Sequence, residues 1–269
     1  MTVNGWVAML SRFKYALLAL SLSSCANAYR YFPDPGSNEY LMDKAKACID
    51  DYDFDCAVDS IDPVVVDLPN DPEVVQIAIT AYAGRGNLRV LDLIQEISSG
   101  LSSTNLFAIL AEHFPSATEV ERLDVEHAVE LLEAYESDAA NRSDTMNILA
   151  FFLYYGEIGV IMSDYAYDGA ATVAGSWDAC SNSDVNLPDD QVQLVARALA
   201  NLVDISDNLP GNSAVTDTFS SFAATISAYG LSKTIVCPDG ALKCKALRMV
   251  IGNDSGGIGL GPDNSLICP

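Results

Sequence analysis

The residues at the two ends of one central helix most restrict what this chain can fold into. Asp71 is followed by Pro72 and Glu73, and a Gly-Arg-Gly stretch occupies residues 84–86. An acidic N-cap with proline at the first helical position is a strong helix start. The N–H groups of the first turn have no acceptor within the helix, so the proline loses no hydrogen bond there. Glycine just beyond the last turn ends a helix. Comparable signals recur along the chain and indicate helices that arrive in pairs, joined by short turns.

Strand signals are nearly absent, and residues 234–236 are the only candidate. We therefore expect an all-α fold, an antiparallel helix-pair solenoid or bundle with an irregular, disulfide-linked C-terminal segment. The expected helices cover residues 38–51, 54–66, 72–83, 87–98, 104–114, 118–136, 143–162, 188–206 and 214–229. Ser116 and Glu119 have the spacing of a capping box, which predicts the start of the sixth of these helices. Residues 148–162 are the most apolar run, but this run is too short for a membrane span and contains Glu157, so we expect a buried core helix.

The first helix pair contains a regular spacing of small and large apolar residues. Six residues carry it: Leu41, Ala45, Phe54, Ala57, Ile61 and Pro69. This spacing resembles the tetratricopeptide repeat (TPR), in which small residues let two helices approach, large residues fill the gap and a proline ends the second helix. The resemblance implies a concave surface that binds a peptide or protein without chemistry of its own.

A second, degenerate unit of this pattern begins at Pro72. Tyr82 and Gly86 hold its eleventh and fifteenth positions, whereas Leu91 replaces a small residue. The register is lost beyond residue 100, and another kind of all-α bundle is the alternative. We assign residues 38–230 to a helical-repeat domain and residues 231–269 to the irregular C-terminal segment.

Residues 1–24 have the pattern of a cleaved secretory signal peptide. Arg12 and Lys14 precede an apolar run over residues 15–22, which is too short to span a bilayer as a helix. Met9 offers a second start for the same leader.

Leu22-Ser23-Ser24-Cys25 closes the leader and resembles the bacterial lipobox. The resemblance implies that Cys25 receives diacylglycerol and becomes the first residue of a protein anchored in membrane lipid. Ala26 after the cysteine favours the outer membrane, with the protein facing the periplasm. Residues 25–37 would then be the tether. An ordinary cleavage near residues 26–28, with Cys25 discarded, is the alternative.

The chain carries 37 acidic and 14 basic residues, which gives a net charge of −23. Such a surface repels nucleic acid and anionic headgroups, because binding either needs a positive field. We therefore expect no nucleic-acid partner. The acidity indicates a surface for basic partners, loosely held Ca²⁺ or a solubilising coat.

Beyond Cys25 the chain has an even number of cysteines: Cys48, Cys56, Cys180, Cys237, Cys244 and Cys268. In an exported protein this indicates disulfides, and six cysteines allow 15 pairings. Local pairing would join Cys48 to Cys56, provided that their Cα atoms lie within about 7 Å, and Cys237 to Cys244. Cys180 would then pair with Cys268. A zinc site is the alternative, although the chain has no CxxC spacing and neither histidine lies near a cysteine cluster.

The sequence contains no complete set of catalytic residues. Residues 254–257 resemble the Asp-Ser-Gly-Gly segment of trypsin-like proteases, with His113 upstream, but a helical chain lacks the β-barrels that this site needs. The alternating acids of residues 51–55 lack the EF-hand pattern. His113 and His127 are expected on helix surfaces. We therefore expect no enzyme, cofactor or metal site, with Ca²⁺ as the alternative.

These features favour a non-catalytic, lipid-anchored scaffold that holds a protein partner in the cell envelope. A second hypothesis is a solute-binding accessory lipoprotein of a transport system. Four aromatic residues would then line a ligand pocket among the helices: Phe151, Phe152, Tyr154 and Tyr155. An unrecognised enzyme is the third.

Overall fold

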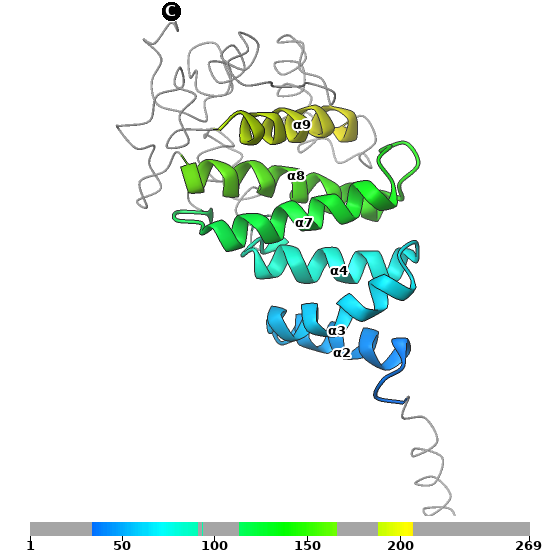
Figure 1. Cartoon of the computed structure of the whole chain (residues 1–269). Helices are drawn as coiled ribbons and strands as arrows, with labels where there is room; N and C mark the ends of the chain where they lie inside the picture. The colour runs from blue at the N-terminus through cyan, green and yellow to red at the C-terminus, as the bar shows by residue number, and fades with distance from the viewer. Residues whose placement is uncertain (1–33, 91–92, 94–112, 166–187, 207–269) are drawn as a thin grey trace, which may run out of the picture.

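A computed structural model describes residues 34–90, 93, 113–165 and 188–206 of the chain. Six helices account for most of these residues: α2 (Asn38–Asp50), α3 (Phe54–Asp67), α4 (Pro72–Arg85), α7 (Glu119–Tyr135), α8 (Asp144–Tyr165) and α9 (Asp189–Ser206). They are stacked in chain order, from α2 and α3 at one end to α9 at the other (Figure 1). No strand occurs within these ranges, so the all-α expectation is confirmed for this part of the chain.

The boundaries expected for these six helices agree with the observed ones to within a few residues. The expected helices at 87–98 and 104–114 lie largely outside the described residues. The helix at 214–229, the candidate strand at 234–236 and the segment 231–269 lie wholly outside them, as do residues 1–33 with the leader and Cys25. The same holds for four of the cysteines: Cys180, Cys237, Cys244 and Cys268.

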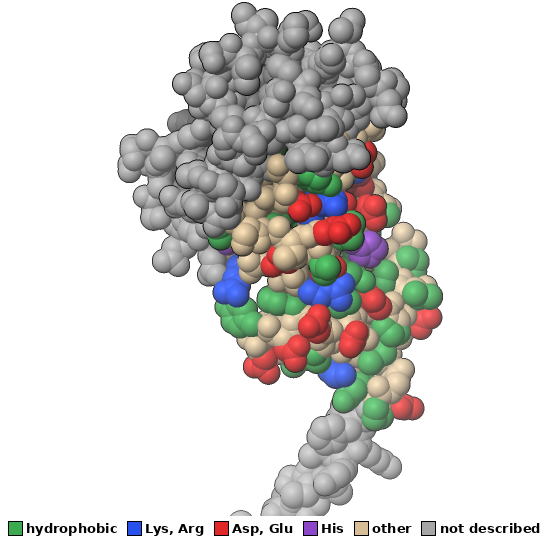
Figure 2. Space-filling view, turned by 60° about the vertical axis from the view of Figure 1, so that its left-hand side comes forward, with side chains coloured by type: hydrophobic (Ala, Val, Ile, Leu, Met, Phe, Trp, Pro, Cys, Tyr) green, Lys and Arg blue, Asp and Glu red, His purple; other side chains and the backbone are tan. Residues whose placement is uncertain are grey.

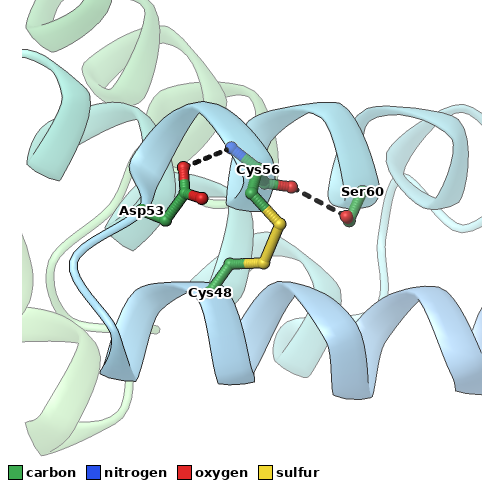
Figure 3. The surroundings of a disulfide bond; sticks show 4 residues. All are labelled: Cys48, Asp53, Cys56 and Ser60. Atoms are coloured by element: carbon green, nitrogen blue, oxygen red, sulfur yellow. Dashed lines mark hydrogen bonds between the residues drawn. A yellow bond between two sulfur atoms is a disulfide. The ribbon is translucent and has the colours of Figure 1, made fainter.

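The turn between α2 and α3 is held by a helix cap and a disulfide. Asp53 caps α3 by accepting a hydrogen bond from the backbone N–H of Cys56 at 3.1 Å. Cys48 and Cys56, whose Cα atoms are 5.8 Å apart, form a disulfide across the turn (Figure 3). The pairing expected for these two cysteines is therefore present. It closes a loop that contains Tyr52, which has a left-handed φ of 59°.

The residues that carry the repeat spacing lie mostly at the interface of α2, α3 and α4. Ala45, Ala57 and Ile61 are completely buried there. Leu41 is partly buried against the same cluster. Phe54 is half-buried, and its ring lies against α4. The small residues thus sit where the helices approach, as helix packing requires.

Two prolines lie near the end of α3, and only one was expected to affect this helix. Pro69 is exposed and follows α3, whose last residue is already Asp67. Pro63 lies inside the helix, where its missing N–H removes the hydrogen bond to the carbonyl of Asp59. Pro63 is exposed, so the buried face of α3 can still pack and keep the segment helical.

α4 is buried on two faces and connects two hydrophobic clusters. Val74 and Ala78 belong to the cluster with α2 and α3. Val75 and Ile79 belong to a larger cluster that includes residues of α7, α8 and α9. Tyr82 packs against both. α4 therefore lies between two layers, with apolar residues on the two faces that contact them and with Glu73 and Gln76 exposed.

The C-terminal end of α4 packs closely against a helix on either side. Gly84 lies against the ring of Phe54 in α3, where any side chain would collide. Gly86 lies against the backbone of α7 in the same way. Between the two glycines, Arg85 donates from Nε and Nη2 to the two carboxylate oxygens of Asp124 in α7, at 2.8 and 2.7 Å. Glycine is needed at both positions because the neighbouring helices leave no room for a Cβ.

The capping box expected from Ser116 is wrong by two residues, because Thr118 caps α7. Its Oγ1 accepts from the backbone N–H of Glu121 at 3.3 Å, and the Glu121 carboxylate accepts from the backbone N–H of Thr118 at 2.7 Å. The cause is tertiary. The backbone N–H of Ala117 donates to Oγ of Ser163 in α8 at 2.7 Å, which ties the chain before the helix begins.

α8 is the most apolar of the described helices. By length and composition it is the one helix among them that could cross a membrane, yet 78% of its most apolar stretch is buried inside the protein. α7 and α9 both pack against it. This is the environment of a core helix, as expected from the sequence.

Replacing Gly86 with alanine should destabilise the junction between α4 and α7. The added Cβ would lie 2.5 Å from Cγ2 of Val125 and 2.7 Å from the backbone oxygen of Glu121. Because Gly86 has an ordinary φ of −73°, the effect comes from crowding alone. We expect the free energy of unfolding to fall by about 1–3 kcal/mol, measured by urea denaturation of the mature chain.

Gly36→Ala is the matched control, because the nearest atom to its added Cβ is Oδ1 of Asp34, 3.8 Å away. This variant should unfold at the same urea concentration as the wild type or slightly higher. Equal stability of the two variants would contradict the close approach of α4 and α7.

Candidate functional site

A charged cluster lies inside the apolar layer formed by α7, α8 and α9. Glu157, in the middle of α8, is completely buried. Arg197 of α9 donates from Nη2 to Oε1 of Glu157 at 2.7 Å. The other carboxylate oxygen, Oε2, has no hydrogen-bond partner in the described part of the chain. A buried charge is costly unless it is paired, so this contact fixes where α9 sits on α8.

Glu133 of α7, which is half-buried, completes this group of side chains around Glu157, called here the buried charge cluster. Arg197 contacts its Oε2 from Nη1 at 3.3 Å. Tyr154 of α8 and Asn201 of α9 donate to its Oε1 at 3.1 and 3.2 Å. One guanidinium is thus shared by two carboxylates, and each of the three helices supplies at least one member. The cluster sets the relative positions of the helices more specifically than apolar packing does.

The electrostatics of the cluster favour a protonated Glu157. Burial raises the pKa of Glu157 to about 8, against the attraction of Arg197, and the nearby Glu133 and Glu126 raise it further. Burial likewise raises the pKa of Tyr154, and the neighbouring Glu133 adds to the effect. Glu157 therefore holds its proton at neutral pH, when most carboxyl groups are ionised.

A second charged contact joins α7 to the end of α8. Arg122 is buried and donates to Glu126 at 2.6 Å and to Asp164 at 2.8 Å. Its guanidinium also lies over the ring of Tyr165, 5.5 Å from the ring centroid. Burial raises the pKa of Glu126, although Arg122 opposes this shift. These contacts hold α7 and α8 together.

Tyr82 is the centre of a third polar group, which spans α3, α4 and α7. It donates to Asp62 of α3 at 2.9 Å, and the ring of His127 in α7 meets its ring edge to face at 4.5 Å. Burial and Asp62 raise the pKa of Tyr82 to about 12. Its hydroxyl is therefore a hydrogen-bond donor at any physiological pH.

Two hollows open on the described surface. The polar hollow, of about 600 Å³, lies between the first turn of α4 and the loop from α7 to α8. Glu73, Gln76, Tyr135 and Arg142 are among its lining residues. Arg142 is held by its own loop, since its Nε donates to the backbone carbonyl of Glu136 at 2.7 Å.

The hairpin hollow, of about 230 Å³, lies beside the disulfide-linked turn between α2 and α3. Tyr52 and Phe54 of that turn face it, together with Leu88 and Val90 beyond the end of α4. Asp50 also contributes to its lining. The two hollows thus differ in character, because the hairpin hollow is mostly apolar with charge at its edge.

The structure also places the residues proposed to line a ligand pocket. Phe151, Tyr154 and Tyr155 are buried, and Phe152 is partly buried against the same hydrophobic cluster. Neither of the two hollows is lined by any of them. Their packing therefore gives no support to the solute-binding hypothesis.

The candidate polar residues have structural contacts instead. His113 and His127 are half-buried rather than freely exposed, His113 beside Phe114 and His127 beside Tyr82. Among the acids of residues 51–55, Asp53 is used as a helix cap. No group of three or more His, Cys, Asp or Glu residues in the described ranges has an arrangement that could hold a metal ion.

The buried charge cluster was not found from the sequence. Glu157 was noticeable as a charge in an apolar run, but it served only as an argument against a membrane span. Its partner Arg197 lies 40 residues away, and Glu133 lies 64 residues from Arg197. No local pattern pairs residues over such distances; a search for charges at apolar helix positions would have found Glu157 alone.

Comparison of the chain with protein-family models, curated proteins and solved structures gave no match. The functional argument therefore rests on the geometry. The ion pairs of the described region join helices to one another, and the polar hollow and the hairpin hollow are places where another molecule can be held.

The stability of the protein should depend on the proton of Glu157. A folded pKa of about 8, raised from an ordinary value of 4.5, adds stability that is fully present below pH 4.5 and is lost as the pH rises through 8. The side chain of the Glu157→Gln variant does not titrate. We therefore expect the stability of this variant to fall much less than that of the wild type as the pH rises. Urea midpoints of the wild type and the variant, measured between pH 5 and pH 8.5, would give the slope of stability against pH for each.

The exposed Glu119→Gln is the control and should keep the slope of the wild type. If Glu157→Gln and the wild type lose stability in parallel as the pH rises, Glu157 is not the group that holds the proton.

Proposed function

We propose that this protein is a non-catalytic binding scaffold of the cell envelope, held at the membrane by a lipid on Cys25. Its helices would form a TPR-like array that binds a protein partner. The alternative of a solute-binding lipoprotein is less well supported, because the aromatic residues proposed to line its pocket are packed in the core.

The observation that carries this proposal is the position of α4. This helix packs against α2 and α3 on one side and against α7 on the other, so one helix belongs to two layers. Stacking in which each unit contacts only its neighbours is the construction principle of helical-repeat proteins. Such stacks present extended surfaces, and binding through them needs no reactive group.

The charged side chains of the described region hold its helices together. Arg85, Arg122 and Arg197 each form an ion pair with an acid on another helix: Asp124, Asp164 and Glu133. Acidic side chains remain on the surface, where they lie among hydrophobic ones in the lower part of the described region in Figure 2. A surface that mixes acidic and apolar groups suits a basic, partly apolar partner.

The tether is supported by the sequence before the first helix. The Leu-Ser-Ser-Cys segment ends at Cys25, and α2 begins at Asn38, where Ser37 caps it by accepting from the backbone N–H of Tyr40. Twelve residues, 26–37, would therefore separate the lipid-bearing cysteine from the first helix. The binding surface would be kept close to the membrane.

Lipid attachment is tested by labelling cells with an alkyne analogue of palmitate. The wild type should take up the label and remain with the membrane fraction. Cys25→Ser should do neither, because no sulfur remains to receive the lipid. Ser24→Ala keeps a small residue before the cysteine and is the matched control, expected to behave as the wild type.

Mass spectrometry of the mature N-terminus would show whether the chain begins at an acylated Cys25. A mature chain that begins at residues 26–29 without acyl groups would show an ordinary cleaved signal peptide and would remove the lipid anchor from the proposal.

The binding function is tested separately, by crosslinking in intact cells followed by purification of the protein. We expect the same envelope protein to be recovered in repeated experiments from the wild type. Recovery of no partner in any repeat would count against a scaffold, whatever the lipid experiment shows.

A further inference from the structure

The turn between α2 and α3 presents an aromatic ring that the fold does not use for its core. The side chain of Tyr52 is one of the most exposed large hydrophobic groups in the described residues, at 65%. Its ring meets that of Phe54 edge to face, with centroids 6.1 Å apart. Both residues line the hairpin hollow. An exposed ring of this kind is available for contact with another molecule.

This ring is held in place by the covalent and hydrogen-bonded structure of the turn. Tyr52 has a left-handed backbone conformation, and the next residue, Asp53, donates its backbone N–H to the carbonyl of Cys48 at 2.8 Å. The disulfide from Cys48 to Cys56 closes the turn on its other side (Figure 3). A ligand that binds here meets a ready surface and pays little entropy for ordering it.

The charges around the hollow favour a cation. Asp50 contributes to the lining, and Asp51, Asp53 and Asp55 are exposed on the same turn. Within the lining, Asp50 is matched by Arg89, so the excess of negative charge comes from the three exposed acids beside the hollow. A cation gains from nearby carboxylates and from the face of an aromatic ring.

The size of the hollow limits what can fill it. Its volume of about 230 Å³ is below the roughly 300–1,000 Å³ typical of small-molecule pockets. It suits a single long side chain, whose apolar stem can contact Leu88 and Val90 while its charge remains near Asp50.

We propose that the hairpin hollow binds a lysine or arginine side chain from a basic, partly apolar segment of a partner polypeptide. This proposal rests on the proposed scaffold function and names the chemistry of its partner. The aromatic pair contacts the cationic group, and the nearby carboxylates favour a positive charge over a negative one. The apolar lining packs against the aliphatic part of the side chain.

The test uses the full mature chain and two pools of immobilised short peptides with random flanking residues. One pool has lysine or arginine at its centre and the other has glutamate. We expect the wild type to be retained by the basic pool at physiological salt and not by the acidic pool.

Tyr52→Asn removes the ring while keeping the turn, because asparagine adopts left-handed backbone conformations more readily than most residues. Retention by the basic pool should fall about threefold to tenfold, as expected for the loss of an aromatic contact to a cation. Asp50→Asn should also weaken retention and reduce its dependence on salt.

Val66→Asn and Asp59→Asn are the matched controls, because these exposed residues of α3 do not line the hollow. Both should be retained as the wild type is. Equal retention of the wild type, Tyr52→Asn and Asp50→Asn would show that the acidic surface attracts basic peptides in general, and would overturn the proposal. Absence of any preference for the basic pool would do the same.

The crosslinking experiment separates this proposal from the scaffold function. If the wild type recovers a partner that Tyr52→Asn also recovers undiminished, the scaffold stands and the hollow is not its binding site. If Tyr52→Asn loses the partner while Val66→Asn keeps it, the hollow is the site.

Discussion

The contact between the end of α4 and α7 is the constraint on which the arrangement of the layers depends. Gly84 and Gly86 let α4 lie against α3 on one side and α7 on the other, and Arg85 between them forms a bidentate ion pair with Asp124. The side chain of Asp124 is almost buried. Loss of one member of such a pair typically costs about 3–5 kcal/mol, because the other charge is left without a partner. Crowding and charge therefore position the same two helices.

Beyond this junction the protein uses charges where a simple core would use apolar residues. Arg122 joins α7 to α8, and Arg197 joins α9 to both. Apolar packing alone permits helices to slide and rotate, since many arrangements bury similar areas. A shared guanidinium permits few, because its donors have fixed directions. Burial raises the pKa of Glu157, and the one arginine beside it is shared with the partly exposed Glu133, so the protonated form of Glu157 is favoured.

Local signals predicted the helices well because their causes are local. Asp71 and Pro72 begin α4 by satisfying or omitting N–H groups within one turn. Cys48 and Cys56 are close in sequence, so a helical turn brings them within reach of each other. The start of α7 was expected to within one residue, but its cap was misplaced, because two capping patterns overlap at Ser116 and Thr118. The choice between them was made by a hydrogen bond to Ser163 of α8, which no local pattern contains.

The sequence by itself determined that the described region is helical and, to within a few residues, where its helices begin and end, because capping and periodicity act over a few residues. Only the tertiary structure decided which charges meet, why both glycines flanking Arg85 are required, and that Tyr52 stands beside a hollow with Asp50. Those features depend on side chains brought together from separate helices, and their energies exist only after the helices have packed.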